Sequence, residues 1–271
     1  MEFRTGLTLA SLFIYLLLPC VSMAGVSVTS GLTYEKETQP GGTYRGTIQL
    51  RNNGDMPQEV KIYQTDYLFF SDGRNIYGEP GKDPRSNADW ITFSPHRFTI
   101  PPKGTSQVNY TLEVPDDKSL TGTYWSMLMI EGISSSSPEA SRPKKDTIKV
   151  GISQVIRYGA QIRTQIGDTG ARELKFVKTR LLKEDKKRIL QLDIENIGER
   201  LLRPDLWVDL YDEKGKSIGK FKGGKLGVYP ATSVRFKIDL SQVPKGTYKA
   251  MIVADCGDDD LFGATYTLKF Q

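Results

Sequence analysis

The chain has 271 residues, of which 38% are hydrophobic, and a formal net charge of +5 at pH 7. One histidine and two cysteines nearly exclude a zinc site with ordinary ligands, and acidic and basic side chains are mixed along the chain in a way that argues against nucleic-acid binding.

The N-terminal segment has the organisation of a secretory signal peptide. Arg4 supplies a positive charge, residues 7–21 are mostly apolar, and Ser22-Met-Ala24 is a small-x-small cleavage site. The apolar run is short for a membrane span. Cys20 could mark a lipoprotein, but Pro19 stands where a small residue is required. We expect residues 1–24 to be removed, which leaves an exported chain with no second apolar run and a single cysteine.

Short runs of alternating apolar and polar residues follow one another in the first half of the mature chain. Strands are predicted at residues 26–30, 44–50, 60–67, 90–93, 98–100, 107–114, 122–130 and 147–162. The segment 70–88 is rich in Gly, Pro, Asp and Asn and is predicted to be a surface excursion. No segment has a helical period of useful length, so the pattern favours an immunoglobulin-like β-sandwich.

The last two of these strands are separated by residues 131–146, a segment too long and too polar for a tight hairpin turn. The strand 147–162 is therefore predicted to lie behind a loose Ser-rich loop, which is unusual for a small β-domain.

After a predicted linker at residues 167–170 the β pattern begins again, with strands at 174–182, 189–194, 206–211, 234–240, 246–254 and 262–270. In each half an early strand ends in Asn-x-Gly and a late strand opens with Gly-Thr-Tyr. We predict an all-β protein of two tandem immunoglobulin-like domains, residues 25–166 and 171–271. The Asn-x-Gly turns are expected to need a residue that tolerates positive φ.

The residue inventory gives little support to catalysis. His96 is the only histidine, it lies in a predicted turn, and no nucleophile-elbow, P-loop or GxGxxG motif is present. We therefore expect no enzymatic activity, no catalytic residue, no cofactor and no metal site.

Several side-chain groups have two interpretations each. The acidic cluster 255–260 is a solvated hairpin turn or a calcium site, and Cys256 within it is an exposed thiol or a small buried residue. The lysines around residues 214–225 protect a sheet edge or face an acidic surface. The three tryptophans, Trp90, Trp125 and Trp207, pack in cores or stack on sugars.

The strand 147–162 carries one apolar row, Ile148, Val150 and Ile152, because alternate side chains of a strand share a face. This row either packs in its own sandwich or lies on an edge and binds a partner by β-strand addition.

The first half of the mature chain resembles the N-terminal domain of the periplasmic pilus-assembly chaperones. The resemblance rests on Val26-Ser-Val28, on the runs 90–95, 98–102 and 107–110, and on the long strand behind a loose polar loop. It implies two immunoglobulin-like domains and an exported, pilin-like subunit as partner, with an outer-membrane usher as a second candidate partner. It also implies that Ile148, Val150 and Ile152 fill the groove of the subunit's unfinished sandwich.

In that family a basic pair in the interdomain cleft anchors the C-terminal carboxylate of the subunit. Arg157 is the nearest match to the member late in the long strand, with a linker-facing salt bridge as its alternative role. The other member is an arginine in the first strand, and residues 26–34 contain none.

Two functions follow from these observations. The first is a non-enzymatic, periplasmic chaperone-like protein that binds exported β-rich subunits by strand addition. The alternative is an extracellular or cell-surface immunoglobulin-like module that contacts surface polymer or adhesion proteins, which the turn motifs of the second half also fit.

Overall fold

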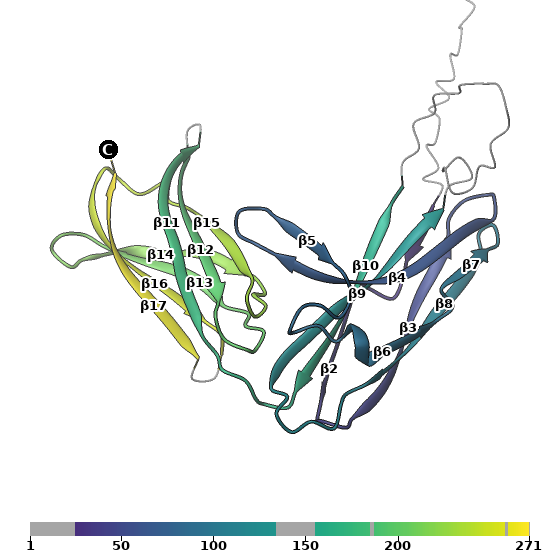
Figure 1. Ribbon diagram of the computed structural model, residues 1–271. Coiled ribbons are helices and arrows are strands. Elements are labelled where there is room, and N and C mark those ends of the chain that lie inside the picture. The colour runs from purple at the N-terminus through teal and green to yellow at the C-terminus, as the bar shows by residue number, and fades with distance from the viewer. Residues whose placement is uncertain (1–24, 134–154, 185–186, 258–259, 271) are drawn as a thin grey trace, which may run out of the picture.

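The computed structural model describes residues 25–133, 155–184, 187–257 and 260–270, which form two β-sandwiches joined by a short linker (Figure 1). The N-terminal sandwich consists of β1 (Val26–Val28), β2 (Thr33–Thr38), β3 (Thr43–Asn52), β4 (Gln58–Phe69), β5 (Asn75–Gly78), the 3₁₀ turn η1 (Ala88–Trp90), β6 (Ile91–Ser94), β7 (Arg97–Ile100), β8 (Thr105–Glu113), β9 (Gly122–Ile133) and β10 (Arg157–Ile166). The C-terminal sandwich consists of β11 (Leu174–Glu184), β12 (Lys187–Asn196), β13 (Asp205–Tyr211), β14 (Ser217–Lys225), β15 (Ser233–Asp239), β16 (Gly246–Asp255) and β17 (Leu261–Phe270).

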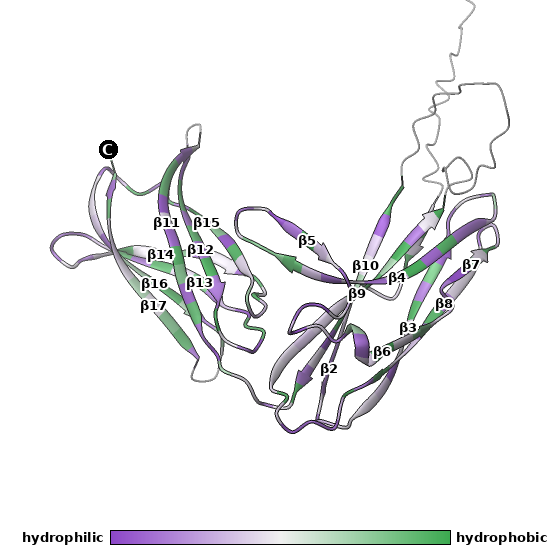
Figure 2. Ribbon diagram, in the orientation of Figure 1, coloured by the Kyte–Doolittle hydropathy of each residue, from purple (hydrophilic) through white to green (hydrophobic). Residues whose placement is uncertain are grey.

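The N-terminal sandwich packs a sheet of strand order β1-β3-β8-β6 against a sheet of order β2-β10-β9-β4-β5, and β7 also pairs with β4. Alternate residues such as Ile48, Val108 and Ile162 point between the sheets and are fully buried. Hydrophobic and hydrophilic segments alternate along the strands (Figure 2). The first two strands lie in different sheets, because β1 pairs with β3 whereas β2 runs parallel to β10.

The C-terminal sandwich packs the sheet β11-β12-β15 against the sheet β14-β13-β16-β17. Its core is built from alternate residues of both sheets, with Leu192, Leu206, Phe236 and Ile252 at its centre. The prediction of an all-β chain with two tandem sandwiches is confirmed.

The strand pattern missed three strands, β2, β5 and β14, all of which are polar and largely exposed. The prediction of a surface excursion at residues 70–88 is wrong in part. β5 pairs with β4 inside this segment, and Asn87 and Ala88 at its end are buried. Their burial depends on contacts with β9 and β10 that no local pattern contains.

The two Asn-x-Gly turns do not depend on positive φ, which the sequence predicted as the reason for this motif. No residue of either turn has positive φ. Instead, Asn52 and Asn196 are buried, and each side-chain oxygen accepts the N–H of the glycine two residues later. The Asn52 amide donates to the carbonyls of Met56, Ile100 and Pro101. Asparagine is required because its side chain satisfies buried backbone groups.

Within these described ranges no helix is long and apolar enough to cross a membrane. The predicted signal peptide, residues 1–24, lies outside the described residues.

Candidate functional site

The edge of β10 is the first element of the candidate site. β10 pairs with β9 along its whole length, from Arg157 opposite Glu131 to Ile166 opposite Gly122. On its other side β2 begins at Thr33, which lies opposite Gln161. In the part of the chain that the structure describes, no strand lies beside residues 157–160 on this side.

The direction of the backbone groups along this edge follows from one hydrogen bond. The N–H of Gln161 donates to the carbonyl of Leu32, so it points toward the β2 side. Because backbone groups two residues apart in a strand point the same way, the N–H and C=O of Gly159 also point to that side. The N–H and C=O of Gly159 therefore face an open edge, because β2 begins only opposite Gln161.

Apolar side chains continue this edge beyond the strand. Val155 and Ile156 are 40% and 37% exposed. Ile156 and Tyr158 belong to the same even-numbered row as Ala160 and Ile162 in the core. The predicted row Ile148, Val150 and Ile152 has the same parity in the sequence, but these three residues lie outside the described residues.

Arg157 is placed at the beginning of β10. Its Nε lies 2.9 Å from a carboxylate oxygen of Glu131, and its side chain is 58% exposed. Further along β10, the side-chain oxygen of Gln161 accepts a 2.6 Å hydrogen bond from the hydroxyl of Tyr229 in the second domain. The two positions are four residue steps apart along the strand, about 13 Å. Arg157 therefore pairs within its own sheet.

Arg163 is the β10 arginine that reaches the second domain. One of its terminal nitrogens lies 3.4 Å from Glu35, and Arg203 of the C-terminal sandwich lies 2.6 Å from the same carboxylate oxygen. The Arg163 guanidinium also stacks over the Tyr229 ring, and its Nε is buried without a hydrogen-bond partner. Two guanidinium groups share one carboxylate here, which leaves one net positive charge.

Sequence reasoning missed Arg163, Arg203 and Glu35. The available signal was Arg163 itself, a charge between the apolar Ile162 and Ile166 of a buried strand. Its pairing with Glu35 depends on the parallel register of β2 and β10, which sets these two residues opposite each other.

An apolar cluster fixes the two sandwiches against each other. Trp125 of β9, Leu201 and Tyr229 are buried together, with Leu68 and Phe69 packed against them. The Trp125 and Tyr229 ring centroids lie 4.9 Å apart, and the Trp125 indole N–H donates to the carbonyl of Tyr67. Trp125 thus packs between the domains, whereas Trp90 packs beside Tyr124 in the N-terminal sandwich and Trp207 lies under Lys220.

Glu199 connects the domains through polar contacts. Its carboxylate accepts hydrogen bonds from Arg85 at 2.6 Å and Thr121 at 2.9 Å, and its backbone carbonyl accepts the N–H of Thr123. Gly122 lies against that carbonyl with φ +73°, and a Cβ there would stand 2.1 Å from the oxygen. Glycine is needed at this position for both reasons.

These contacts predict a pH dependence of the interface. The hydrogen bond from Thr121, together with the Ala171 N–H and Arg85, holds the pKa of Glu199 below its ordinary value although burial opposes the shift. A carboxyl whose folded pKa is lowered stabilises the fold above the pKa of the unfolded state, and this stabilisation is lost as pH falls through the folded pKa.

Glu199→Gln is expected to destabilise the chain at pH 7 and to differ progressively less from the wild type toward pH 3, as measured by urea unfolding. The exposed Glu79, changed to Gln, is the control. A difference for Glu199→Gln that stays constant over this range would contradict the assignment.

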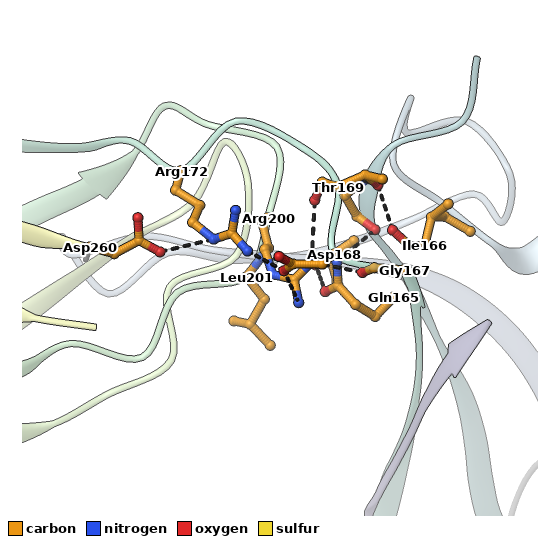
Figure 3. A network of polar contacts seen from close by, with 11 residues as sticks. Gln165, Ile166, Gly167, Asp168, Thr169, Arg172, Arg200, Leu201 and Asp260 are labelled. Carbon is orange, nitrogen blue, oxygen red and sulfur yellow. Dashed lines mark hydrogen bonds and ion pairs between the residues drawn. The ribbon is translucent and has the colours of Figure 1, made fainter. Parts of the chain in front are cut away.

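The linker is held by ion pairs (Figure 3). Asp168 contacts the guanidinium of Arg172 and lies 3.3 Å from that of Arg200, and Arg172 reaches Asp260 at 2.9 Å. Arg200 also donates to the backbone carbonyl of Gly167. The linker is therefore tied to the C-terminal sandwich by charged side chains.

Cys256 lies half-buried beside this network. Burial, and then the charges of Asp260 and Asp255, raise the pKa of its thiol to about 11. The thiol stays protonated at neutral pH and is a poor nucleophile. Within the described ranges no group of three or more His, Cys, Asp or Glu side chains is placed to hold a metal ion.

No protein-family model matches the sequence, and the search of curated proteins gives no match. Solved structures that are similar to the chain include fimbrial chaperones. A chaperone–tip adhesin complex of CFA/I fimbriae aligns with a TM-score of 0.47 and 13% identity, over 90% of this chain and 98% of that chain. The class 5 fimbriae chaperone CfaA gives 0.46 and 12%, over 89% and 98%. The CsuC–CsuE chaperone–tip subunit complex of Acinetobacter baumannii gives 0.45 and 15%, over 89% and 98%.

Proposed function

We propose that the chain is a non-enzymatic, periplasmic chaperone-like protein that binds an exported β-rich subunit by adding a strand at the edge of β10. The observation that carries the proposal is the open side of β10 before Gln161, where the backbone groups of Gly159 face outward. A strand that lies beside β10 there would extend the sheet by main-chain hydrogen bonds.

The side chains around this edge fit an apolar strand. Val155 and Ile156 are exposed at its beginning, and the Ile148, Val150 and Ile152 row precedes them in the sequence. Exposed aliphatic side chains next to an open sheet edge promote association with other strands unless a partner covers them. We propose a pilin-like subunit as that partner, with an outer-membrane usher as a further one.

The fixed arrangement of the domains supports a role for the second sandwich in the same site. A strand that runs along β10 toward Gln161 ends close to the Arg163–Glu35–Arg203 group, where positive charge exceeds negative. We propose that Arg163 and Arg203 attract the carboxylate at the end of the bound strand, while Arg157 orders the beginning of the edge through Glu131.

Capture of a subunit tests the proposal. The tagged chain is co-expressed in a periplasm with an exported pilin-like subunit, and the amount of subunit that co-purifies is measured. Val155→Asp is expected to lower capture at least about tenfold, because a charge at an apolar strand contact opposes desolvation. Val177→Asp is the matched control, since Val177 is a 51% exposed valine on β11 of the other sandwich.

Two measurements on purified protein complete the test. Binding should protect the Gly159 amide from hydrogen exchange, and Arg163→Gln should weaken binding of a synthetic peptide of the subunit's strand with a free terminal carboxylate more than binding of the same peptide with an amidated end. Equal capture by wild type and Val155→Asp, with no protection at Gly159, would contradict strand addition.

A further inference from the structure

The sheet edges of the molecule differ in how well they are protected. β1, β5, β6 and β7 have three or four residues each, and short edges pair poorly with other chains. β2 carries Glu35, Lys36 and Glu37. β15 carries Arg235 and Lys237.

The two longer protected edges, β11 and β14, combine charge with irregularity. β11 has a register shift between Phe176 and Lys178, and four basic residues lie along it. β14 has two register shifts against β13, and it carries Lys220, Lys222 and Lys225. Bulges and lysines are the usual means of preventing edge-to-edge pairing.

β17 has none of this protection. It runs for ten residues, Leu261–Phe270, pairs with β16 without a register shift, and carries one charge, Lys269. Nothing in the described part of the chain pairs with its other side. In Figure 1, β17 borders the C-terminal sandwich on the flank that faces away from the N-terminal sandwich.

The hairpin before β17 shows which backbone groups face outward. The N–H of Cys256 donates to the carbonyl of Asp260, so residues 256 and 260 form a hydrogen-bonded pair. The even-numbered residues of β17 therefore bond to β16, and the odd-numbered ones present their N–H and C=O groups to the open side. Thr265 is the middle one of these, with Gly263 and Thr267 on either side.

We propose that β17 is a homodimer interface, in which the β17 strands of two copies pair antiparallel about a twofold axis at Thr265. The proposal is independent of subunit binding, because it concerns the other sandwich. In this register each outward group meets an outward group: Thr265 faces Thr265 of the second copy, Gly263 faces Thr267, and Leu261 faces Lys269.

The side chains of the even-numbered row agree with the same register. Phe262 would lie opposite Leu268, and Ala264 opposite Tyr266, so the apolar row that packs on the core continues into the second copy. Lys269 meets no like charge, since its counterpart is Leu261. A self-complementary patch of this kind is what a twofold dimer requires. The combined sheet would join β14-β13-β16-β17 of one copy to the same sheet of the other.

The test is the mass of the mature chain by sedimentation equilibrium between about 1 and 500 μM, because a dimer is concentration-dependent. The wild type is expected to be dimeric at the upper end. Thr265→Lys places two ammonium groups opposite each other at the axis and should raise the dimer dissociation constant at least about tenfold. Thr265→Glu should do the same. An equimolar mixture of these two variants should recover the mass of the dimer, because opposite charges then meet.

Thr267→Lys is the matched control, since in this register it faces Gly263 of the second copy and brings no lysines together across the interface; within its own chain it lies opposite Lys249 of β16. It should associate nearly as the wild type does. Far-UV circular dichroism and the thermal midpoint confirm that all variants fold. A monomeric wild type overturns the proposal, as does dimerisation that Thr265→Lys leaves unchanged. A mixture that stays monomeric, or a loss in Thr267→Lys equal to that in Thr265→Lys, overturns the twofold register.

Discussion

Replacing Trp125 by alanine is expected to lower the free energy of unfolding by about 3–5 kcal/mol and to loosen the fixed arrangement of the two sandwiches. Trp125 is 3% exposed and packs against Tyr229 of the other sandwich. Its loss leaves a large cavity between the domains and removes the partner of the Tyr67 carbonyl. Both effects add to the cost, because a partly buried carbonyl that loses its hydrogen-bond donor is itself destabilising.

Two measurements separate the effects of this variant. Urea unfolding gives the loss of stability, and small-angle scattering of the folded protein gives the change in the distance between the domains. Trp207→Ala is the matched control, because Trp207 lies on the outer face of β13, under Lys220 and with its indole N–H donated to Asp209 of the same strand. The control should cost less than about 1.5 kcal/mol and leave the scattering unchanged. A Trp125→Ala chain that scatters like the wild type would show that the cluster does not hold the domains.

The position of Trp125 illustrates what could be predicted from the sequence. Alternation along β9 predicts a strand with two faces, and the face of Leu128 and Ile130 belongs to the core. The opposite face of the same strand holds Trp125 and is also buried, because the second sandwich covers it. Local periodicity cannot reveal this, since the cover comes from Leu201 and Tyr229, which lie far along the chain.

The same reasoning explains the outcome for the arginines of β10. A late strand with a basic residue can be recognised from its composition. Deciding whether Arg157 or Arg163 reaches the second domain requires knowing where β2 begins. β2 is polar and was not predicted as a strand, although its register with β10 sets Glu35 opposite Arg163. The open length of β10 is a consequence of the same register, so neither element of the candidate site could be derived from the pattern alone.

Replacing Asp66 by alanine should have an effect comparable to that of Trp125→Ala, about 3–5 kcal/mol, through a different route. The Asp66 carboxylate is 4% exposed and accepts the backbone N–H groups of Gly81, Lys82 and Asp83 at 2.8–3.1 Å, and also the Ser86 hydroxyl. Without it the N–H groups of Gly81 and Asp83 lose their partner, the N–H of Lys82 keeps only its 3.4 Å hydrogen bond to the Glu79 carbonyl, and the loop after β5 loses its anchor.

Loss of the Asp66 anchor should also weaken the interdomain interface. The loop carries Arg85, which binds Glu199, and Asn87, whose buried amide donates to the Ile162 carbonyl and to Thr164 of β10. We therefore expect Asp66→Ala to accelerate hydrogen exchange both at residues 81–83 and at Thr123, whose N–H donates to the Glu199 carbonyl. Asp72→Ala is the control, because Asp72 is an exposed carboxylate of the β4–β5 hairpin that pairs with Arg74, and it should cost less than about 1 kcal/mol. If Asp66→Ala is no less stable than this control, or if exchange at Thr123 is unchanged, the loop does not connect Asp66 to the interface.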